Sequence, residues 1–466
     1  MSAVVRYLKK ERPRHLEELK QLLKIPSVST ESKHAKDVRK AAEWVKKRLD
    51  RAGCTRVELH ETDRHPIVYG EWLGAPGKPT ILVYGHYDVQ PVDPIELWKT
   101  PPFEPTVIGD RIYARGASDD KGQFIVHINA LEAHLKHGGC PVNVKFLIEG
   151  EEEVGSDSLD PFIARNKQKL SCDAVVVSDT ALFGKGVPSI CYGLRGLAYL
   201  ELEVQGSSGD LHSGSFGGAV INPAQALVEM LASLKDAKGR INVPGFYANV
   251  KRLTVAERRA FAGLPHSDAK FRKALGAPEL YGEAGYTTLE RIWARPTLDI
   301  NGIWGGFSGE GAKTVIPAKA HAKISMRLVP NQTPKEIARK VTQHLKRITP
   351  KAVKLSVRPL HGGDGWLAPT DHPAMQAAGR AMKRAFGKTP VFVREGGSIP
   401  IIATFDRILK VPAVLMGLGL NDDNLHAPNE KMELSNFYRG IEAAAHLMEE
   451  LGNADTGGRT PKKSRR

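Results

Sequence analysis

The chain has 466 residues, of which 41% are hydrophobic and 26% are charged, as in an ordinary water-soluble globular protein. Its 45 glycines and 30 prolines are too few for a collagen-like or low-complexity chain, so we exclude fibrous and intrinsically disordered proteins. At about 150 residues per domain, the length predicts two or three compact units.

The charge balance is basic. Lys and Arg number 67 against 52 for Asp and Glu, which gives a net charge of +15. Five of the positive charges lie within residues 459–466, at the end of the chain. Such a tail usually serves solubility, and contact with nucleic acid is the less favoured interpretation.

Neither the apolar runs nor the cysteines indicate a membrane or secreted protein. No apolar run approaches the roughly 20 residues needed to span a bilayer, and residues 1–20 carry charge in every short window, unlike a secretory signal. The four cysteines lack CxxC spacing, which argues against a disulfide scaffold or a thiolate zinc site. We therefore expect a cytoplasmic location.

Strand and helix patterns alternate in the first part of the chain and again near its end. Residues 35–52, 122–136 and 435–451 have helical patterns. Four apolar runs rich in β-branched residues predict buried parallel strands, at 80–84, 142–148, 174–177 and 412–416. This alternation predicts an α/β domain, an α/β/α sandwich, in which the final helix closes the fold.

The middle of the chain has a different pattern. In chain order it predicts a strand, a helix, a charged helical stretch, a strand, a helix and a strand, at 197–204, 223–234, 255–275, 316–328, 334–348 and 353–357. This order predicts a separate, ferredoxin-like α+β open-faced sandwich inserted into the first domain. We place the inserted domain at 196–366, which divides the first domain into segments 1–195 and 367–466.

Metal-type side chains follow each of the four predicted parallel strands at its carboxyl end, where ligands gather in parallel α/β sheets. A fifth acidic cluster precedes the helix at 122–136. The clusters are His86 with Asp88, Asp119 with Asp120, residues 149–153, Asp179, and Asp422 and Asp423 with His426. One such cluster would be weak evidence, but five at one sheet edge predict a metal site.

The residue types narrow the choice of metal. Imidazole nitrogen and carboxylate oxygen without thiolate suit Zn²⁺ first, with Mn²⁺ or Co²⁺ as alternatives. Two histidines and at least three carboxylates exceed the three protein ligands of a single catalytic zinc, so we predict two metals that share a bridging carboxylate. Two divalent ions, three carboxylates and one bridging hydroxide sum to zero charge, as burial requires. Such a pair can make a bound water acidic enough to attack near pH 7.

The chain resembles a known family, the M20 metallopeptidases, and within it the group of cytosolic nonspecific dipeptidases and carnosinases. The resemblance extends over nearly the whole chain. Its motifs are GHYDVQP (85–91), RGASDDKG (115–122), EGEEEVGS (149–156), SDT (178–180), YGLRG (192–196), DLHSG (210–214), AKTVIP (312–317), RLVPNQTP (327–334), REGGSIP (394–400) and NLHAPNE (424–430).

The resemblance implies roles for the residues of the first domain. It implies that His86 and Asp179 hold one metal, that Glu153 and His426 hold the other, and that Asp119 bridges them. Asp88 would orient the imidazole of His86. Glu152 would be the general base, with Glu151 as the alternative. The peptide bond between Asp119 and Asp120 is expected to be cis.

The resemblance also implies that the inserted domain forms a homodimer interface and supplies substrate-binding groups. His212 would reach the active site of the partner subunit and stabilise the oxyanion, although a turn-capping histidine is the simpler alternative. Thr314, Arg327 and Ser398 match positions that recognise the carboxylate at the substrate's C-terminus, and for Arg327 a surface ion pair is the alternative. Glu395 would lie near the free amino group. Glu151 departs from the apolar residue common in related dipeptidases.

The expected activity is metal-dependent hydrolysis of the peptide bond in dipeptides or short peptides, by a bridging hydroxide with Glu152 as base. Deacylation of N-acyl amino acids is the alternative with the same metal chemistry. A basic nucleic-acid-binding protein is the alternative from another class, and the acidic interior argues against it because phosphates would be repelled there.

Overall fold

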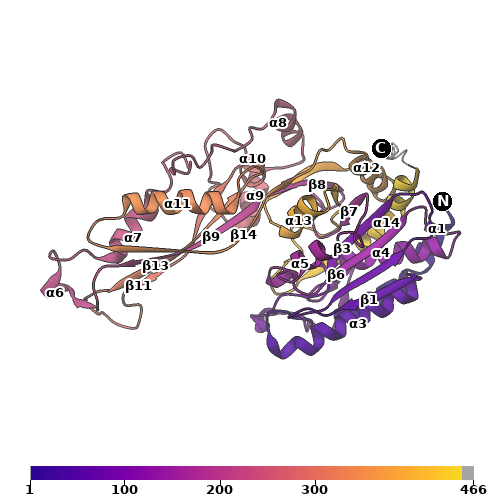
Figure 1. Cartoon of the computed structure of the whole chain (residues 1–466), viewed down its shortest axis with the longest axis horizontal. Helices are drawn as coiled ribbons and strands as arrows, with labels where there is room; N and C mark the ends of the chain where they lie inside the picture. Colours follow the sequence, from indigo (N-terminus) through magenta and orange to yellow (C-terminus); the bar gives the residue numbers. More distant parts are fainter. Residues whose placement is uncertain (1, 454–466) are drawn as a thin grey trace, which may run out of the picture. The chain divides into compact units, whose positions relative to one another are not determined.

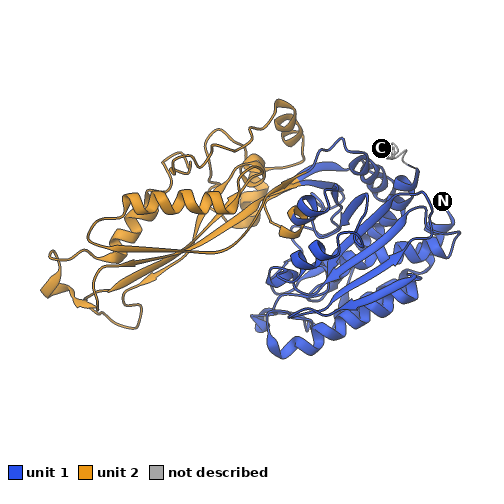
Figure 2. Ribbon diagram, viewed as in Figure 1, with its two compact units in different colours: residues 1–192, 368–393, 404–466 blue, residues 193–367, 394–403 orange. Residues whose placement is uncertain are grey.

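The computed structural model describes residues 2–453, so the basic tail at 459–466 lies outside the described residues. The chain divides into two compact units (Figure 2). Unit 1 comprises residues 1–192, 368–393 and 404–466, and unit 2 comprises residues 193–367 and 394–403. The segment 394–403 groups with unit 2, although the whole of 367–466 was expected to belong to the catalytic domain. The reason is that Ser398 and Arg394 bond to Arg327 and Glu257 of unit 2.

Unit 1 is built on a mixed β-sheet in which strands follow the order β1-β2-β6-β3-β7-β17-β8 (Figure 1). The bounds are β1 (Arg56–His60), β2 (Ile67–Trp72), β3 (Thr80–His86), β6 (Asn143–Glu149), β7 (Ala174–Val177), β8 (Ser189–Leu194) and β17 (Ala413–Leu415), with β16 (Val391–Glu395) paired to β8. The four strands predicted from apolar runs, β6, β3, β7 and β17, are neighbours and run parallel. Their carboxyl ends therefore meet at one edge.

Helices cover both faces of this sheet. One layer packs in the order α3 (Ala35–Ala52), α4 (Lys121–Leu135), α14 (Leu434–Asn453) and α12 (Pro373–Phe386), with α1 (Ala3–Lys10) and α2 (Arg12–Leu23) against α4. On the other side, Phe405 of α13 (Pro400–Ile408) contacts Tyr84, and Phe162 of α5 (Leu159–Arg165) contacts His60. A small sheet of β4 (Thr106–Ile108), β5 (Arg111–Tyr113) and β18 (Lys431–Glu433) adjoins α14. The predicted α/β/α sandwich is confirmed.

Unit 2 has the ferredoxin-like topology that the sequence predicted. Its antiparallel sheet has the order β11-β13-β9-β14, and helices α7 and α11 pack against it. The bounds are β9 (Gly196–Gln205), α7 (Pro223–Ala232), β11 (Thr297–Gly305), β13 (Lys319–Leu328), α11 (Pro334–Ile348) and β14 (Lys354–Gly363). Strands β9 and β13 alternate buried and partly exposed residues, because only one of their faces lies under the helices. The shorter elements are β10 (Leu211–His212), α6 (Ser213–Phe216), α8 (Val255–Ala262), α9 (Asp268–Leu275), α10 (Thr288–Ala294), β12 (Val315–Ile316) and β15 (Trp366–Leu367).

Three local features differ from the expectation. The helical stretch at 255–275 is two helices, α8 and α9, separated at Gly263 and Pro265, and Ser267 caps the second one. Strands β1 and β2 were not predicted, and β2 pairs antiparallel with β6, so the sheet is mixed and not wholly parallel. Strand β11 was also missed; it is an edge strand with mostly exposed residues, so its sequence lacks the buried pattern.

Within residues 2–453, no helix combines the length and the apolar character that a membrane crossing requires. All four cysteines are free thiols.

The core of unit 1 also encloses titratable groups. His15 of α2 is completely buried, and the Arg14 guanidinium lies 3.3 Å from its Nε2 atom. Burial lowers the pKa of His15 to about 4.

We expect His15 to make the free energy of unfolding depend on pH. Its pKa is about 6.5 in the unfolded chain and about 4 when folded, so between these values the unfolded chain binds more protons. The stability due to the neutral imidazole is present above pH 6.5 and is lost as pH falls toward 4, by at most about 1.4 kcal/mol per pH unit. Urea unfolding at several pH values, in chelator, measures this slope. A His15→Gln variant should have a shallower slope, and equal slopes would contradict the assignment.

Candidate metal centre

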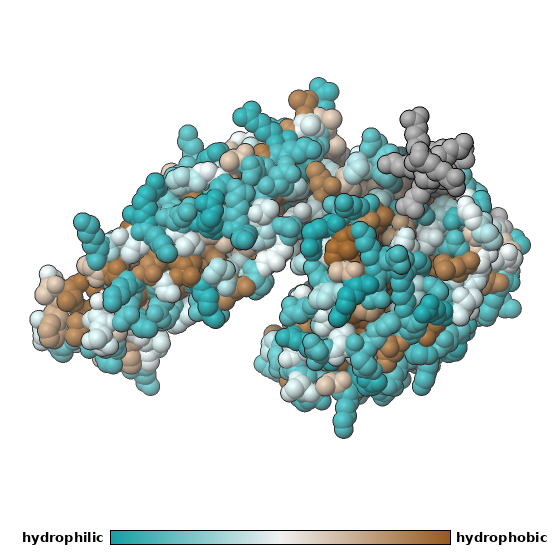
Figure 3. All heavy atoms as spheres, in the orientation of Figure 1, coloured by the Kyte–Doolittle hydropathy of each residue, from teal (hydrophilic) through white to brown (hydrophobic). Residues whose placement is uncertain are grey.

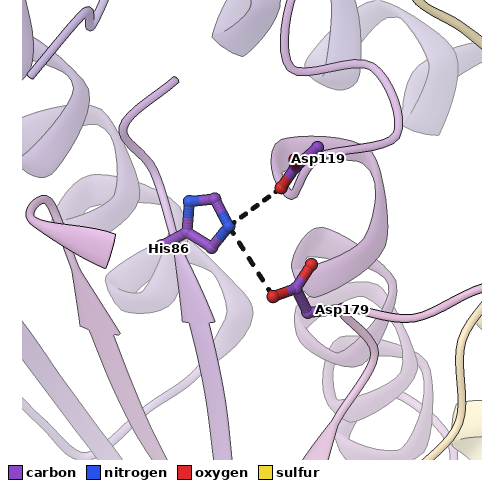
Figure 4. Close-up of side chains that lie close together, drawn as sticks. All are labelled: His86, Asp119 and Asp179. Carbon is purple, nitrogen blue, oxygen red and sulfur yellow. Dashed lines mark hydrogen bonds and ion pairs between the residues drawn. The ribbon is translucent and has the colours of Figure 1, made fainter. Parts of the chain in front are cut away.

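The first group of candidate ligands surrounds His86, the last residue of β3. The imidazole is completely buried, and its Nδ1 atom lies 3.1 Å from the backbone oxygen of Asp88. The other ring nitrogen, Nε2, faces the carboxylates of Asp119, at 3.1 Å, and Asp179, at 3.9 Å (Figure 4). These three side chains offer ligand atoms that all lie within 4.8 Å of one another.

Asp119 belongs to a second group as well. Its Oδ2 atom lies 2.9 Å from Nε2 of His426, whereas its Oδ1 atom faces His86. His426 Nε2 is also 3.4 Å from Oε2 of Glu153, and the ligand atoms of Asp119, Glu153 and His426 lie within 4.8 Å of one another. The two groups therefore share one carboxylate, with one oxygen directed to each. The peptide bond between Asp119 and Asp120 is cis, as expected from the resemblance.

Each ligand is supported by its own strand end or loop. Glu153 follows β6, Asp179 follows β7, and His426 follows β17 in a loop where its φ angle is +58°. The Asp88 carboxylate accepts hydrogen bonds from Ser29 Oγ at 2.6 Å and from the backbone N–H of Glu153 at 3.2 Å. Asp88 thus ties the loop after β3 to the loop after β6.

The electrostatics of these groups suit divalent cations. Burial raises the pKa of Glu153 and of Asp179 well above the usual value, and the nearby charge of Asp119 adds to the shift. Burial also acts to raise the pKa of Asp119, but its hydrogen bonds with His426 and His86 hold that pKa below the usual range. Crowded carboxylates are costly unless cations neutralise them. The donor set of two imidazoles and three carboxylates, without sulfur, fits two ions of the Zn²⁺, Mn²⁺ or Co²⁺ type.

Adjacent glutamates after β6 have different surroundings. Glu151 is only 2% exposed, and its two carboxylate oxygens accept hydrogen bonds from Thr62 Oγ1 and the N–H groups of His65 and Ser158. It therefore anchors the loop before β2. Glu152 is partly buried in a short 3₁₀ turn (Glu152–Val154), and burial raises its pKa to about 6. A pKa near neutrality is suited to a general base, which favours Glu152 over Glu151 for that role.

Unit 2 brings together two of the predicted substrate-binding residues. The Arg327 guanidinium donates a 2.8 Å hydrogen bond to Ser398 Oγ, and this hydroxyl donates to the backbone oxygen of Arg195. Burial lowers the pKa of Arg195 to about 10, and the charge of Arg327 contributes to this shift. In the described part of the chain Arg327 forms no ion pair with a carboxylate, which disfavours the ion-pair alternative. Glu395 lies in the same segment, at the end of β16.

His212 lies at the N-terminus of α6, and its Nδ1 atom accepts hydrogen bonds from the N–H groups of Gly214 and Ser215. His212 therefore does cap the start of this helix, as the simpler alternative proposed. The capping also fixes the tautomer, because the neutral imidazole then carries its proton on Nε2. The backbone oxygen of Thr314 accepts from the N–H of Ser213, so Thr314 lies beside this exposed histidine.

Two residues that contact the candidate ligands were not predicted from the sequence. Gln90 donates a 2.7 Å hydrogen bond to Glu153 Oε2, and Glu430 accepts the N–H of Asp119 at 3.1 Å. Both lie inside motifs named above, GHYDVQP and NLHAPNE. Their closeness in sequence to His86 and His426 could therefore have identified them as residues near the ligands. Ser29, which holds Asp88, lies in no such motif and gave no signal.

Comparison with known proteins shows the family to which the chain is similar. The model of Peptidase family M20/M25/M40 matches residues 82–450. The Cys-Gly metallodipeptidase dug1 of Schizosaccharomyces pombe is 37% identical over 460 residues, which cover 95% of this chain and 97% of that protein. The structure of human carnosine dipeptidase 1 has a TM-score of 0.84 and 32% identity, covering 97% of this chain and 98% of the other. An M20 family metallo-carboxypeptidase from Sulfolobus solfataricus has a TM-score of 0.85 and 34% identity, covering 94% and 99%.

We expect the affinity for divalent metal to increase with pH. In the metal-free protein, the hydrogen bond to Asp119 raises the pKa of His426 to about 9, so a metal ion must displace a proton at neutral pH. Affinity should therefore rise from pH 6 toward pH 9, with net proton release. Calorimetric titration in two buffers of different ionisation enthalpy measures both quantities, and a His212→Ala variant, which keeps all five candidate ligands, should behave like the wild type. An affinity that does not change with pH would contradict this prediction.

Proposed function

The chain belongs to peptidase family M20/M25/M40, and from this premise we propose that it is a dinuclear metallodipeptidase. The observation that carries the proposal is the pair of ligand groups joined at Asp119, with the partly buried Glu152 beside them. In one position we place His86, Asp179 and Asp119, and in the other Glu153, His426 and Asp119. Zn²⁺ is the proposed metal, with Mn²⁺ or Co²⁺ as alternatives.

The chain's own residues supply binding and proton transfer. Metal ions in these positions, when bound, would lower the pKa of a water molecule and polarise the peptide carbonyl. Glu152, whose pKa of about 6 leaves it mostly ionised at pH 7, would accept the proton of the attacking water and deliver it to the leaving amine. Asp88 would hold the His86 ring through its backbone oxygen.

The proposed substrates are dipeptides or short peptides with a free carboxylate. The similar proteins bear the names of a Cys-Gly dipeptidase and a carnosine dipeptidase. In this chain, Arg327 with Ser398 would bind the carboxylate, helped by the positive charge of Arg195 and by Thr314, and Glu395 would face the free amino group. Deacylation of N-acyl amino acids has no support in the similar proteins described above.

We propose that His212 acts across a homodimer. Its Nε2–H is exposed and directed by the capping bonds at Nδ1, so it can donate to the oxyanion in the active site of the partner subunit. The self-associating surface would be on unit 2, where hydrophobic side chains gather around α6 and α7 (Figure 3). The exposed apolar residues there, and on the edge strand β11 and the turn after it, are Phe216, Val220, Val228, Ile300, Ile303, Trp304 and Phe307. Apolar patches of this kind mark protein interfaces.

We also propose a cytoplasmic location. The support is the four free thiols, since proteins of the cytoplasm keep their cysteines reduced whereas proteins of oxidising compartments commonly form disulfides. Binding of nucleic acid has no support among the described residues.

Replacement of Glu152 by Gln should abolish dipeptide hydrolysis while metal content is retained. The amide keeps the shape of the side chain but cannot accept the proton, so kcat should fall by about 100-fold or more. Hydrolysis of Cys-Gly and carnosine, with metal analysis of the purified protein, measures both effects. Glu151→Gln is the matched control, because Glu151 bonds to Thr62 and His65; it should lower stability and keep most of the activity. If Glu152→Gln retained full kcat, the assigned base would be wrong.

Mixing two inactive variants tests the shared site. His212→Ala should lose activity because the oxyanion loses its donor, and Glu152→Ala should lose it because the base is absent. A heterodimer of the two chains contains one site with both groups intact, so an equal mixture refolded or co-expressed should recover about a quarter of wild-type activity. Activity that stays at the level of the separate variants would contradict the action of His212 in the partner's site.

A further inference from the structure

Glu430 is a completely buried glutamate with an unusual set of hydrogen bonds. Its Oε1 atom accepts the N–H groups of Ser118, at 2.9 Å, and Asp119, at 3.1 Å. Its Oε2 atom accepts the N–H of Gly116, at 2.9 Å, and Nη1 of Arg115, at 2.8 Å. Both oxygens are thus fully used, and three of the four donors are backbone groups of the loop that presents Asp119.

The same pair of residues connects the other ligand segments. Arg115, which bonds to Glu430, also donates through Nη2 to the backbone oxygen of Pro91, at the end of the segment that begins with His86. Glu430 itself lies four residues after His426, and its backbone oxygen accepts the N–H of Ala114. The Arg115–Glu430 pair therefore links the segments that carry His86, Asp119 and His426.

The segment that ends at Glu430 requires such an anchor. Asn424, His426 and Asn429 all have φ angles between +57° and +65°, in the left-handed region that costs free energy for residues with a side chain. Strained backbone persists where its surroundings hold it, and here Glu430 is fixed by four hydrogen bonds beyond its own loop.

We propose that Glu430 is a positioning residue that sets the separation of the two metal positions. It fixes the backbone on which Asp119 is carried, and it fixes that backbone relative to the loop of His426. A shift of this loop would change the reach of the shared carboxylate to both ligand groups at once, so metal binding should depend on Glu430 although the residue binds no metal itself. The inference rests on the proposed function only in taking Asp119 and His426 as ligands.

The test is the Glu430→Gln variant of the full-length protein, titrated with Zn²⁺ and with Mn²⁺. Glutamine has one acceptor oxygen, so in either orientation its NH₂ group faces two of the four donors and leaves them unpaired. We expect metal affinity to fall about 10- to 100-fold, as for other residues that support ligands. Activity should be lost at limiting metal and recovered at saturating metal, with KM unchanged.

Glu132→Gln is the matched control. Glu132 is a buried glutamate of α4 that accepts hydrogen bonds from Arg48 and Arg14, so its loss also breaks buried ion pairs of unit 1. It contacts none of the three ligand segments. This variant should have a lower melting temperature and wild-type metal affinity, which separates a positioning role from a merely structural one.

The outcomes are distinguishable. If the wild type binds two ions and Glu430→Gln binds them equally tightly, the inference is wrong and the proposed function stands. If the wild type binds fewer than two ions, the proposed function fails and the inference fails with it.

Should Glu430→Gln not fold, a second variant is available. Arg115→Lys keeps a cation beside Glu430 but removes the forked guanidinium that also bonds to Pro91. This variant should weaken metal binding in the same direction, and unchanged affinity would overturn the inference.

Discussion

The arrangement of unit 1 depends on the mutual repulsion of buried carboxylates. Asp119, Glu153 and Asp179 lie close together at the carboxyl edge of the sheet, where burial opposes their ionisation and each charge raises the free energy of the others. Two imidazoles alone do not neutralise this charge. Divalent cations do, and the donor atoms are already directed inward before any ion binds. Metal binding is therefore the natural counterpart of a fold that places these acids together.

The sheet and the residues around it hold these charged side chains in fixed positions. Parallel strands bring His86, Glu153 and Asp179 to one edge, and hydrogen bonds from residues that are not ligands then set the orientation of each side chain. Asp88 joins the loops after β3 and β6, Gln90 holds Glu153, and Glu430 holds the backbone of Asp119. The ligands are thus held by a network in which most members carry no metal.

Three consecutive glutamates show how the surroundings assign different roles to one residue type. Glu153 faces His426, Glu152 is partly buried beside the charges of His86 and Asp119, and Glu151 turns away to bond with Thr62 and His65. Glu151 therefore acts as an anchor for the loop before β2. In the same way His212 is both a helix cap and an exposed donor, because the two nitrogens of its ring have separate partners.

The sequence by itself determined the four parallel strands, the α+β character of unit 2 and the residue types of the candidate metal centre. Apolar runs and helical periodicity are local, and the position of His86 or Asp179 directly after a buried strand is visible in the chain. Only the tertiary structure decided that β1 and β2 make the sheet mixed, that Glu151 bonds to a distant loop, and that Glu430 holds the segment of Asp119. These depend on hydrogen bonds between residues up to 315 positions apart, whose pairing leaves no periodic trace in the sequence.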